Sequence, residues 1–456
     1  MSRAILPDPA ARPLRLLVLV LLFASPLAFG AVQKSAFIPL LVASSGAGLL
    51  SWAKGHWARA QGAPMPLVPG RPILLALHGL VLWQLVPLPP WLLKVASPGS
   101  FSFYNDHLLL PLTDWRPISV SPPDTLRGLA FLAGFSLLYG AVFREFGDGR
   151  DRRRLAGTVV LVGLVITVVG LVQARSGQPL LYGIWRPTWD WAVFGPYANR
   201  NHFAGYMVMA IPLSFGFALE ALARLRRDWR TRRVGWLSIG GPEGSALVLR
   251  AALAMALVVG LVASESRGGF VAFALSALAL PFAGRHRRQA FVLVVLVGGL
   301  GIAWIGLDNL QGHFASRGIW VSRIEFWRDM LPMVRDFPAF GTGLNAFASA
   351  YAWYQRIWPR DWFGEAHDEY LQALLDLGVV GALLVGAFLA GLFRDALRAA
   401  SRGPFELGLL GALLGLAFHN LVEFNWQIPA NAATYVVLAA ATRRAAEQLD
   451  PSLNPS

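Results

Sequence analysis

The chain of 456 residues contains no cysteine. Disulfide bonds, thiolate metal sites and cysteine nucleophiles are therefore excluded. Charged residues are scarce, because Asp, Glu, Lys and Arg make up only 14% of the chain, whereas soluble domains carry about 25%. Apolar runs of about 20 residues, long enough for a helix to cross a hydrocarbon core ~30 Å thick, recur from Leu14 almost to the C-terminus. The sequence therefore predicts an all-α, polytopic membrane protein.

Motifs that hold metals and nucleotides are also missing. The sequence has no Asp-x-Asp pair, no Walker-type phosphate loop and no His-Glu-x-x-His, so we expect no metal and no other cofactor. Ser264 or Ser266 with His367 could imitate a hydrolase pair, but no nucleophile-elbow pattern surrounds either serine. A serine hydrolase is therefore not expected.

The net charge of +14 could indicate a nucleic-acid partner. The arginines, however, cluster in short segments between apolar runs, which is the pattern that orients a membrane protein. We therefore expect membrane lipids and no nucleic acid as partners.

We predict about twelve membrane-spanning helices. Their approximate spans are 14–32, 36–53, 72–90, 125–143, 155–174, 202–221, 246–264, 269–284, 290–307, 370–393, 405–424 and 431–446. The first could be misread as a secretory signal, but more spans follow at once, which favours an uncleaved anchor. We divide the chain into N-terminal helices (1–154), a transmembrane core (155–446) and a short tail (447–456).

The distribution of Lys and Arg predicts the orientation. If the N-terminus is cytoplasmic, the inside segments carry 26 of the 40 Lys and Arg residues. Both termini and the tail are then cytoplasmic, and three substantial segments lie outside: 91–124, 175–201 and 308–367. The longest is too long for an idle connector.

We interpret the outer loop 308–367 as a partly helical cap on the membrane surface. From Ile319 to Val334, apolar residues recur at helix-like spacings with charged residues between them. Five tryptophans are candidate interfacial anchors: Trp320, Trp327, Trp353, Trp358 and Trp362. A solvated loop with a few aromatic contacts is the alternative.

Three polar clusters interrupt the apolar pattern, all at predicted outer helix ends. The first contains Asn199, Arg200, Asn201 and His202, entering the sixth span. Guanidinium, amide and free backbone N–H donors at one helix start suit an oxyanion such as phosphate. The alternative is an ordinary helix start capped by Asn199 or Asn201.

The second cluster is Ser264-Glu265-Ser266-Arg267-Gly268-Gly269, in a hairpin so short that Arg267 must lie at the membrane surface. An outer arginine near hydrocarbon requires an anionic partner. That partner could be Glu265, a lipid phosphate or a substrate phosphate.

The third cluster, Glu365 to Gln372, opens the tenth span. On a helix, His367 would share one face with Tyr370 and Leu371. A neutral His367 could accept a proton from a hydroxyl, although a lone histidine is more often structural. A fourth cluster, His419 to Trp426, is interpreted as structural support in which His419 and Glu423 can pair as i,i+4 neighbours.

Four motifs together resemble the O-antigen ligase and O-antigen polymerase superfamily. They are Asn-Arg-Asn-His-Phe-Ala-Gly-Tyr (199–206), Ser-Arg-Gly-Gly (266–269), Gly-Thr-Gly-Leu-Asn-Ala-Phe (341–347) and Ala-His-Asp-Glu-Tyr-Leu-Gln followed by Leu-Gly-Val-Val-Gly (366–381). The resemblance covers roughly residues 190–430. Each motif is short, but their order and the long loop before the histidine make the combination fairly specific.

The resemblance implies a helical inner-membrane glycosyltransferase with a class C fold. Such proteins pass a glycan from undecaprenyl diphosphate, at the periplasmic face and without a metal, to lipid A core, a polysaccharide or a protein. By similarity, Arg267 would bind the diphosphate with help from Arg200, and His367 would be the base or positioning group. Asn199, Asn201, His202 and Tyr370 would support them. Asp368 stands where relatives often carry Asn.

Two alternatives from other classes stay open. Transporters of lipid-linked glycans place polar residues near the bilayer midplane, whereas here the apolar runs are mostly free of charge at their centres. A non-catalytic scaffold for polysaccharide assembly is the other alternative. The sequence does not separate ligase, polymerase and protein glycosyltransferase.

Overall fold

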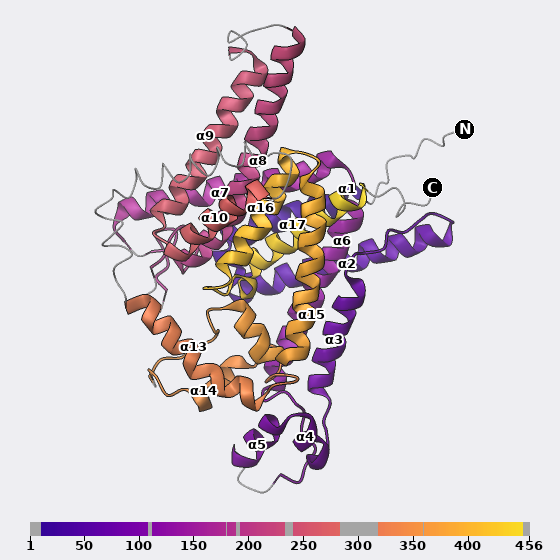
Figure 1. Ribbon diagram of the computed structural model, residues 1–456, viewed down its shortest axis with the longest axis vertical. Helices are drawn as coiled ribbons and strands as arrows, with labels where there is room; N and C mark the ends of the chain where they lie inside the picture. Colours follow the sequence, from indigo (N-terminus) through magenta and orange to yellow (C-terminus); the bar gives the residue numbers. More distant parts are fainter. Residues whose placement is uncertain are drawn as a thin grey trace.

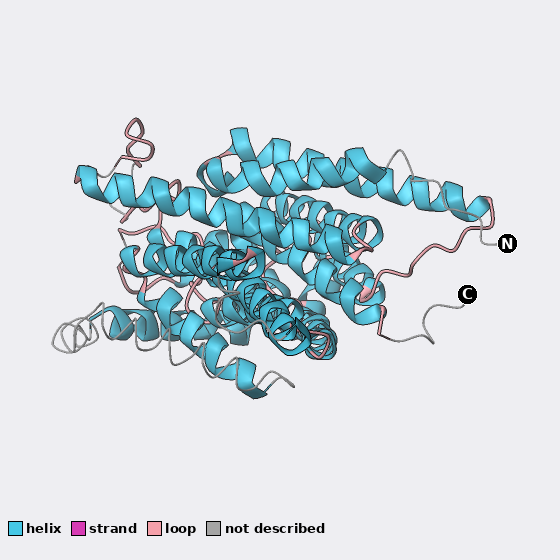
Figure 2. Cartoon of the chain, turned by 90° about the horizontal axis from the view of Figure 1, so that it is seen from above, coloured by secondary structure: helices cyan, strands magenta, loops and turns pink. Residues whose placement is uncertain are grey.

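The computed structural model describes residues 11–107, 112–178, 180–187, 192–232, 240–282, 318–358 and 360–449. Within these ranges the regular elements are helices, joined by loops that contain three isolated β-bridges (Figures 1 and 2). The predicted all-α class is therefore confirmed.

Eleven helices occupy eleven of the twelve predicted spans. They are α1 (Ala11–Leu27), α2 (Lys34–Ala60), α3 (Arg71–Leu85), α6 (Pro122–Glu145), α7 (Gly149–Ser176), α8 (Arg200–Arg232), α9 (Pro242–Ala263), α10 (Arg267–Ala279), α15 (Glu369–Ala400), α16 (Pro404–His419) and α17 (Pro429–Glu447). The predicted span 290–307 lies outside the described residues. Of the helices in the described part, six are long and apolar enough to cross a membrane: α2, α6, α7, α8, α9 and α15. The number twelve therefore stays a prediction.

Four further helices come from the predicted outer segments. They are α4 (Pro90–Ala96), α5 (Pro98–His107), α13 (Gly318–Asp336) and α14 (Phe347–Tyr354). Figure 1 shows them gathered at its lower end, whereas the far ends of α8 and α9 project from the upper end. The two ends of the bundle therefore differ in construction, and the candidate site lies beside α13.

Helix α13 confirms a helical part of the predicted outer loop, and its most buried residues are not the ones whose spacing predicted the helix. Phe326, Met330 and Met333 are buried, while Ile324 and Leu331 are 45% and 48% exposed. Both faces of this helix carry apolar residues, and packing against the aromatic residues of α14, such as Tyr351, selects the buried one. The spacing alone could not make that choice.

The tryptophans of this region divide into two groups. Trp353, Trp358 and Trp362 are exposed, as expected of interfacial anchors, whose membrane contact stays a prediction. Trp327 is half-buried and donates its indole N–H to the carbonyl oxygen of Ala366 at 2.9 Å. The side chain of Trp320 lies outside the described residues.

The centre of the bundle is built on close packing between α8 and α16. A Cβ atom at Gly415 would lie 2.5 Å from the carbonyl oxygen of Val208, and one at Gly408 would lie 2.7 Å from that of Pro212. Glycines therefore allow the two backbones to touch, which is how helices associate where water supplies no hydrophobic driving force. This contact fixes the start of α8 relative to the end of α16.

Helix α15 is interrupted within the predicted tenth span. Gly378 has φ 65° and ψ −171°, a conformation that glycine adopts readily. The N–H groups of Val379 and Val380 donate to the carbonyl oxygens of Pro338 and Ala339 rather than within the helix. The loop that precedes α14 thus packs against the break in α15.

Candidate active site

The first and second polar clusters meet at the starts of two helices. Asn199 accepts the N–H of Asn201 at 2.8 Å and is the cap of α8, so one of the two predicted capping residues is identified. The guanidinium of Arg200 lies 3.0 Å from the carboxylate of Glu265. Glu265, an expected partner of Arg267, thus pairs with Arg200.

Ser266 joins these two helix starts. Its hydroxyl oxygen accepts the N–H of Gly269 at 3.3 Å and so caps α10. The same hydroxyl donates to the side-chain oxygen of Asn201 at 2.8 Å. Arg200 and Arg267 are the first residues of these two neighbouring helices, whose positive dipole ends favour an anion.

His367 lies just outside the helix on which it was predicted. The side chain of Asp368 accepts the N–H groups of Tyr370 and Leu371 at 2.9 and 3.0 Å. It is therefore the cap, and α15 begins at Glu369. His367 has φ 53°, in the left-handed region. The prediction that His367 shares a helical face with Tyr370 and Leu371 is wrong, because α15 begins only after its cap, Asp368.

Glu423 contacts the first and third clusters directly and is linked to the second through Asn201 and Ser266. Its side chain is 1% exposed, and Oε1 accepts hydrogen bonds from Asn201 and Arg323, each at 2.6 Å. Its other oxygen, Oε2, lies 3.6 Å from Nδ1 of His367. The fourth cluster, which we had interpreted as structural support, thus supplies the central carboxylate.

The predicted pair between His419 and Glu423 is not the contact that the structure records. Helix α16 ends at His419, so the two residues do not stand one helical turn apart. The His419 ring instead meets the side-chain amide of Asn425 at 3.2 Å. Glu423 instead contacts Asn201 of α8, Arg323 of α13 and His367.

Burial and charge oppose each other at Glu423. Burial alone would raise the pKa of this carboxyl, but the facing His367, the guanidinium of Arg323 and the nearby His202 outweigh it. The pKa of Glu423 therefore lies well below its ordinary value, and the group is a carboxylate at neutral pH. Glu365 differs, because burial and the charge of Glu423 raise the pKa of its carboxyl despite the opposing effect of His367.

The supporting residues predicted from the sequence lie around this carboxylate. The edges of the His202 and His367 rings both meet the ring of Phe424, at centroid distances of 4.8 and 4.7 Å. The backbone of His202 is held by the side chain of Asn431 at 2.8 Å. Tyr370 donates its hydroxyl to the carbonyl oxygen of Ala417 at 2.8 Å and so ties α15 to α16.

Sequence reasoning did not assign a functional role to two important side chains, Arg323 and Glu423. Arg323 was only one of several charged residues on an amphipathic helix, and nothing in its spacing distinguished it. Glu423 had a signal, because it is an acidic residue among His419, Asn420 and Asn425 at the end of an apolar run. In the described part of the chain, no group of three His, Asp or Glu side chains is arranged to hold a metal ion.

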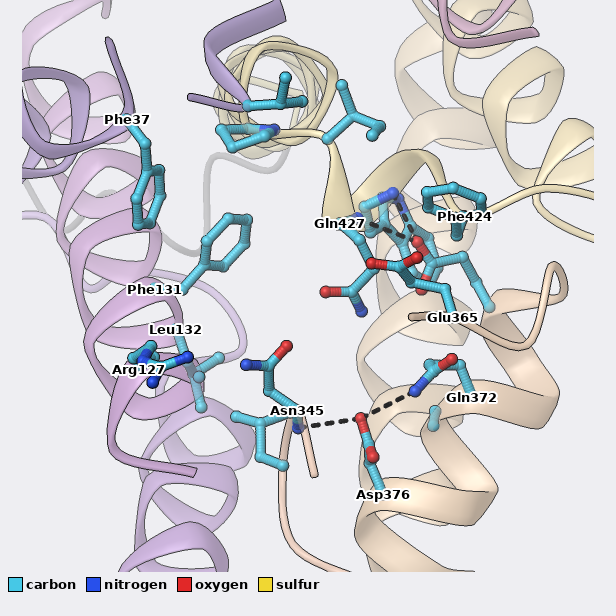
Figure 3. A pocket seen from close by; sticks show the side chains of 18 of the residues that line it. Phe37, Arg127, Phe131, Leu132, Asn345, Glu365, Gln372, Asp376, Phe424 and Gln427 are labelled. Atoms are coloured by element: carbon cyan, nitrogen blue, oxygen red, sulfur yellow. Dashed lines mark hydrogen bonds between the residues drawn. The ribbon is translucent and has the colours of Figure 1, made fainter. Parts of the chain in front are cut away.

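A cavity of about 550 Å³ adjoins the cluster (Figure 3). Its polar wall includes Arg127, Asn345, Glu365 and Asp376, drawn in Figure 3 on facing elements. The rest of the lining combines aliphatic residues, such as Leu77, Leu132 and Val385, with the aromatic residues Phe29, Phe37, Phe131, Tyr197, Phe424 and Trp426. Carboxylates, amides and aromatic faces together are the surfaces that a sugar contacts well.

An apolar cavity of about 200 Å³ adjoins the first one. The two share lining residues, including Phe131, Val385 and Trp426. The smaller cavity lies among α3, α6, α15 and α17 and is lined almost entirely by apolar side chains. Polar and apolar spaces thus lie side by side, as an amphiphilic ligand requires.

Asp376 holds the loop that borders the larger cavity. Its carboxylate accepts the N–H groups of Asn345 and Phe347 at 2.9 and 3.0 Å. Gln372 donates to the same carboxylate at 3.1 Å and accepts the N–H of Ala366 at 2.7 Å. The motif at residues 341–347 and the backbone beside His367 are therefore held by one hydrogen-bond chain.

The comparison with protein families agrees with these features. A family model described as O-antigen ligase matches residues 252–386. The match includes Arg267, Arg323 and His367, and it is narrower than the segment over which we noted a resemblance. No curated protein matches the chain. The resemblance is confirmed over the matched segment: residues 252–386 of this multi-pass membrane protein are similar to the O-antigen ligase family.

Proposed function

We propose that the protein transfers a glycan from undecaprenyl diphosphate to an acceptor hydroxyl at the periplasmic membrane face. One observation carries the proposal: Glu423 and its neighbours link Arg200, the hairpin of Arg267 and His367, although these residues are far apart in the sequence. Cations and a candidate base thus lie at one end of the bundle. The family match supports glycosyl transfer as the reaction class.

In the proposed reaction, the bond between the anomeric carbon and the diphosphate oxygen breaks as the acceptor oxygen attacks the same carbon. The leaving diphosphate gains negative charge, which Arg267 and Arg200 stabilise at the starts of α10 and α8. Fixed guanidinium groups can supply the charge that a metal supplies in other transferases. We therefore propose that transfer continues in the presence of a metal chelator.

His367 accepts the proton of the acceptor hydroxyl in this scheme. Glu423 faces Nδ1 of His367, so Nε2 is the nitrogen left for the acceptor. A buried carboxylate at Nδ1 orients the ring and stabilises the imidazolium that forms, which is the logic of a catalytic dyad. Attack on the face opposite the diphosphate inverts the anomeric configuration, and retention in the product would contradict this step.

The cavities support a lipid-linked glycan as the substrate class. Glu365 and its aromatic neighbours suit sugars, and the adjoining apolar space suits a hydrocarbon chain. The nature of the acceptor is tested by deleting the gene and examining lipopolysaccharide, secreted polysaccharide and glycoproteins separately. Loss or shortening of one product, restored by the wild-type gene and not by an Arg267→Ala gene, is the expected result. Restoration by the Arg267→Ala gene would favour a non-catalytic scaffold.

One observation favours a second candidate, a transporter of lipid-linked glycans. Helix α15 is interrupted at Gly378 beside the cavities, and transporters often build their sites on interrupted helices. Purified protein in detergent separates the two candidates, because a micelle has no second compartment. Formation of the glycosidic product from a lipid-diphosphate glycan and an acceptor shows an enzyme. A protein that binds the donor and yields no product would support the transporter.

A further inference from the structure

A cavity lined by three charged side chains among small and apolar residues lies at the end of the bundle opposite the candidate active site. It has a volume of about 370 Å³ and lies between the start of α3 and the last third of α15. Its lining is Pro69, Gly70, Ile73, Ala387, Ala390, Gly391, Arg394, Asp395 and Arg443. At the usual helical rise, Glu369 at the active-site end of α15 is at most about 37 Å from Arg394. That separation exceeds the ~30 Å hydrocarbon core of a bilayer, so the two ends can reach opposite membrane surfaces.

Arg443 is the buried cation of this cavity. Its side chain is only 3% exposed, stacks over the ring of Phe388 at 4.7 Å and donates hydrogen bonds to the hydroxyl of Tyr139 and the carbonyl oxygen of Phe388. Its Nε lies at ion-pair distance from Oδ2 of Asp395, 3.4 Å away, although this contact is not a well-formed hydrogen bond. A buried guanidinium that shares its carboxylate with a second arginine favours an additional acceptor.

Two glycines make room for this guanidinium. A Cβ atom at Gly70 would lie 2.6 Å from one terminal nitrogen of Arg443, and one at Gly391 would lie 2.9 Å from the other. The packing of α3, α15 and α17 is thus shaped around the position of Arg443. The arginine is held at the cavity wall and not merely extended toward solvent.

The charges of the cavity do not cancel. Asp395 lies 3.2 Å from Arg394 through one oxygen and 3.4 Å from Arg443 through the other. One carboxylate therefore serves two guanidinium groups, and one positive charge remains. A singly charged anion would balance the cavity and could accept hydrogen bonds from both arginines.

The outer surface of α15 indicates what kind of anion fits. Along one side of the helix, Val380 and Leu383 are 40% and 68% exposed, and the exposed Ala387 and Ala390 continue the stripe to Arg394. An apolar stripe that ends at a cavity with an excess of positive charge matches a molecule with hydrocarbon chains below a phosphate. A free phosphate has no hydrocarbon chains that could lie along the stripe.

We propose that this cavity binds the phosphate group of an anionic glycerophospholipid in the leaflet opposite the active site. Arg394 and Arg443 contact the phosphate, and the acyl chains lie along the stripe from Val380 to Ala390. No residue of the candidate active site takes part, so the proposal stands or falls independently of the proposed function.

The test uses the full-length protein in detergent with added dioleoylphosphatidylglycerol, dioleoylphosphatidylcholine or inorganic phosphate. Native mass spectrometry counts retained lipids, and thermal unfolding measures stabilisation. We expect phosphatidylglycerol to be retained and to raise the unfolding temperature more than the other two. Equal stabilisation by inorganic phosphate would assign the cavity to a free anion, and equal retention of phosphatidylcholine would show no preference for an anionic head group. Either result would overturn the proposal.

Three variants test whether phosphatidylglycerol binds at this cavity. Arg394→Gln removes an exposed charge at the cavity, and we expect it to reduce retention of phosphatidylglycerol at least fivefold. Ala390→Leu fills the cavity without changing any charge and should reduce retention similarly. Arg398→Gln, a matched control, removes an exposed arginine of the same helix outside the cavity lining and should retain the lipid. An equal loss in Arg398→Gln, or unchanged retention in both cavity variants, would contradict the assignment.

Discussion

Nδ1 of His367 faces Oε2 of Glu423 at 3.6 Å, inside a cluster that also contains Arg323 and Asn201. His367 lies before the cap of α15, and Glu423 lies in the loop after α16. The imidazole is therefore oriented by a carboxylate from another part of the chain. Substitutions of His367 and of Glu423 can therefore test whether this histidine is catalytic or structural.

Substitution of the histidine is the first prediction. His367→Ala should lower glycan transfer by about 10²- to 10⁴-fold, the range typical of a lost general base. The product formed from a lipid-diphosphate glycan is quantified with purified protein, and folding is checked by thermal unfolding. His56→Ala serves as a control, because His56 is exposed on α2, far along the chain from the site. Wild-type transfer by a folded His367→Ala protein would remove His367 from the mechanism.

Substitution of the carboxylate is the second prediction. Glu423→Gln keeps the shape of the side chain but removes the charge that faces His367. A hydrogen bond to a charged group contributes about 1.5–3 kcal/mol, which this contact of 3.6 Å would reach only if it tightens during the reaction. Because ~1.4 kcal/mol corresponds to a tenfold rate, we expect kcat to fall about 10- to 100-fold. Glu325→Gln is the matched control, since Glu325 is exposed on α13.

A structural role for Glu423 would give a different outcome. If the carboxylate only holds the fold, Glu423→Gln should lower the unfolding temperature and leave kcat per folded molecule unchanged. If it acts through His367, the double variant Glu423→Gln/His367→Ala should be no slower than His367→Ala alone. Additive losses of kcat in the double variant would show that the two residues act independently.

The third prediction concerns the ion pair of Arg200 and Glu265. Glu265 is 63% exposed, so Glu265→Gln should change stability by no more than about 1 kcal/mol. If Arg200 binds the donor diphosphate, Arg200→Ala should lower kcat/KM for the donor about tenfold or more, whereas Glu265→Gln should not lower it. Donor titrations of both variants measure the difference. Equal losses would show that the ion pair, rather than the free guanidinium, matters.

Much of the fold and the grouping of polar clusters could be predicted, because long apolar runs and helix-start residues are local signals. Asn199 and Ser266 cap helices from their own side chains. The relative placement of the clusters followed from a simple topological argument, that outer helix ends lie at one face.

The rest depended on contacts between distant segments. Spacing could not show that Asp368 would be the N-cap and that α15 would therefore begin after His367, because Asp is also tolerated within the first turn. Nor could it show that Glu423 would turn away from His419, since only the end of α16 decides this. The buried face of α13 was likewise decided by the aromatic residues of α14.

The fourth prediction tests the cap before α15. Asn and Asp are comparable capping residues, so Asp368→Asn should keep both stability and transfer near wild-type values. Asp368→Ala removes the acceptor of two N–H groups and should cost about 0.5–2 kcal/mol. Thermal unfolding and product formation are measured for both. A large loss of transfer in Asp368→Asn, without a loss of stability, would show that the negative charge beside His367 is itself required.

The fifth prediction concerns stability in acid. The pKa of Glu423 is depressed in the folded protein, so its contribution to stability is fully present above the ordinary glutamate pKa of about 4.3. It is lost as the pH falls from about 5 toward the folded pKa, because the unfolded chain then binds the proton first. The unfolding temperature of the wild type should therefore fall steeply below about pH 5, and that of Glu423→Gln should fall less. Parallel pH profiles from 7 to 3.5 would show that Glu423 is not the stabilising carboxylate that its buried contacts with Arg323 and Asn201 imply.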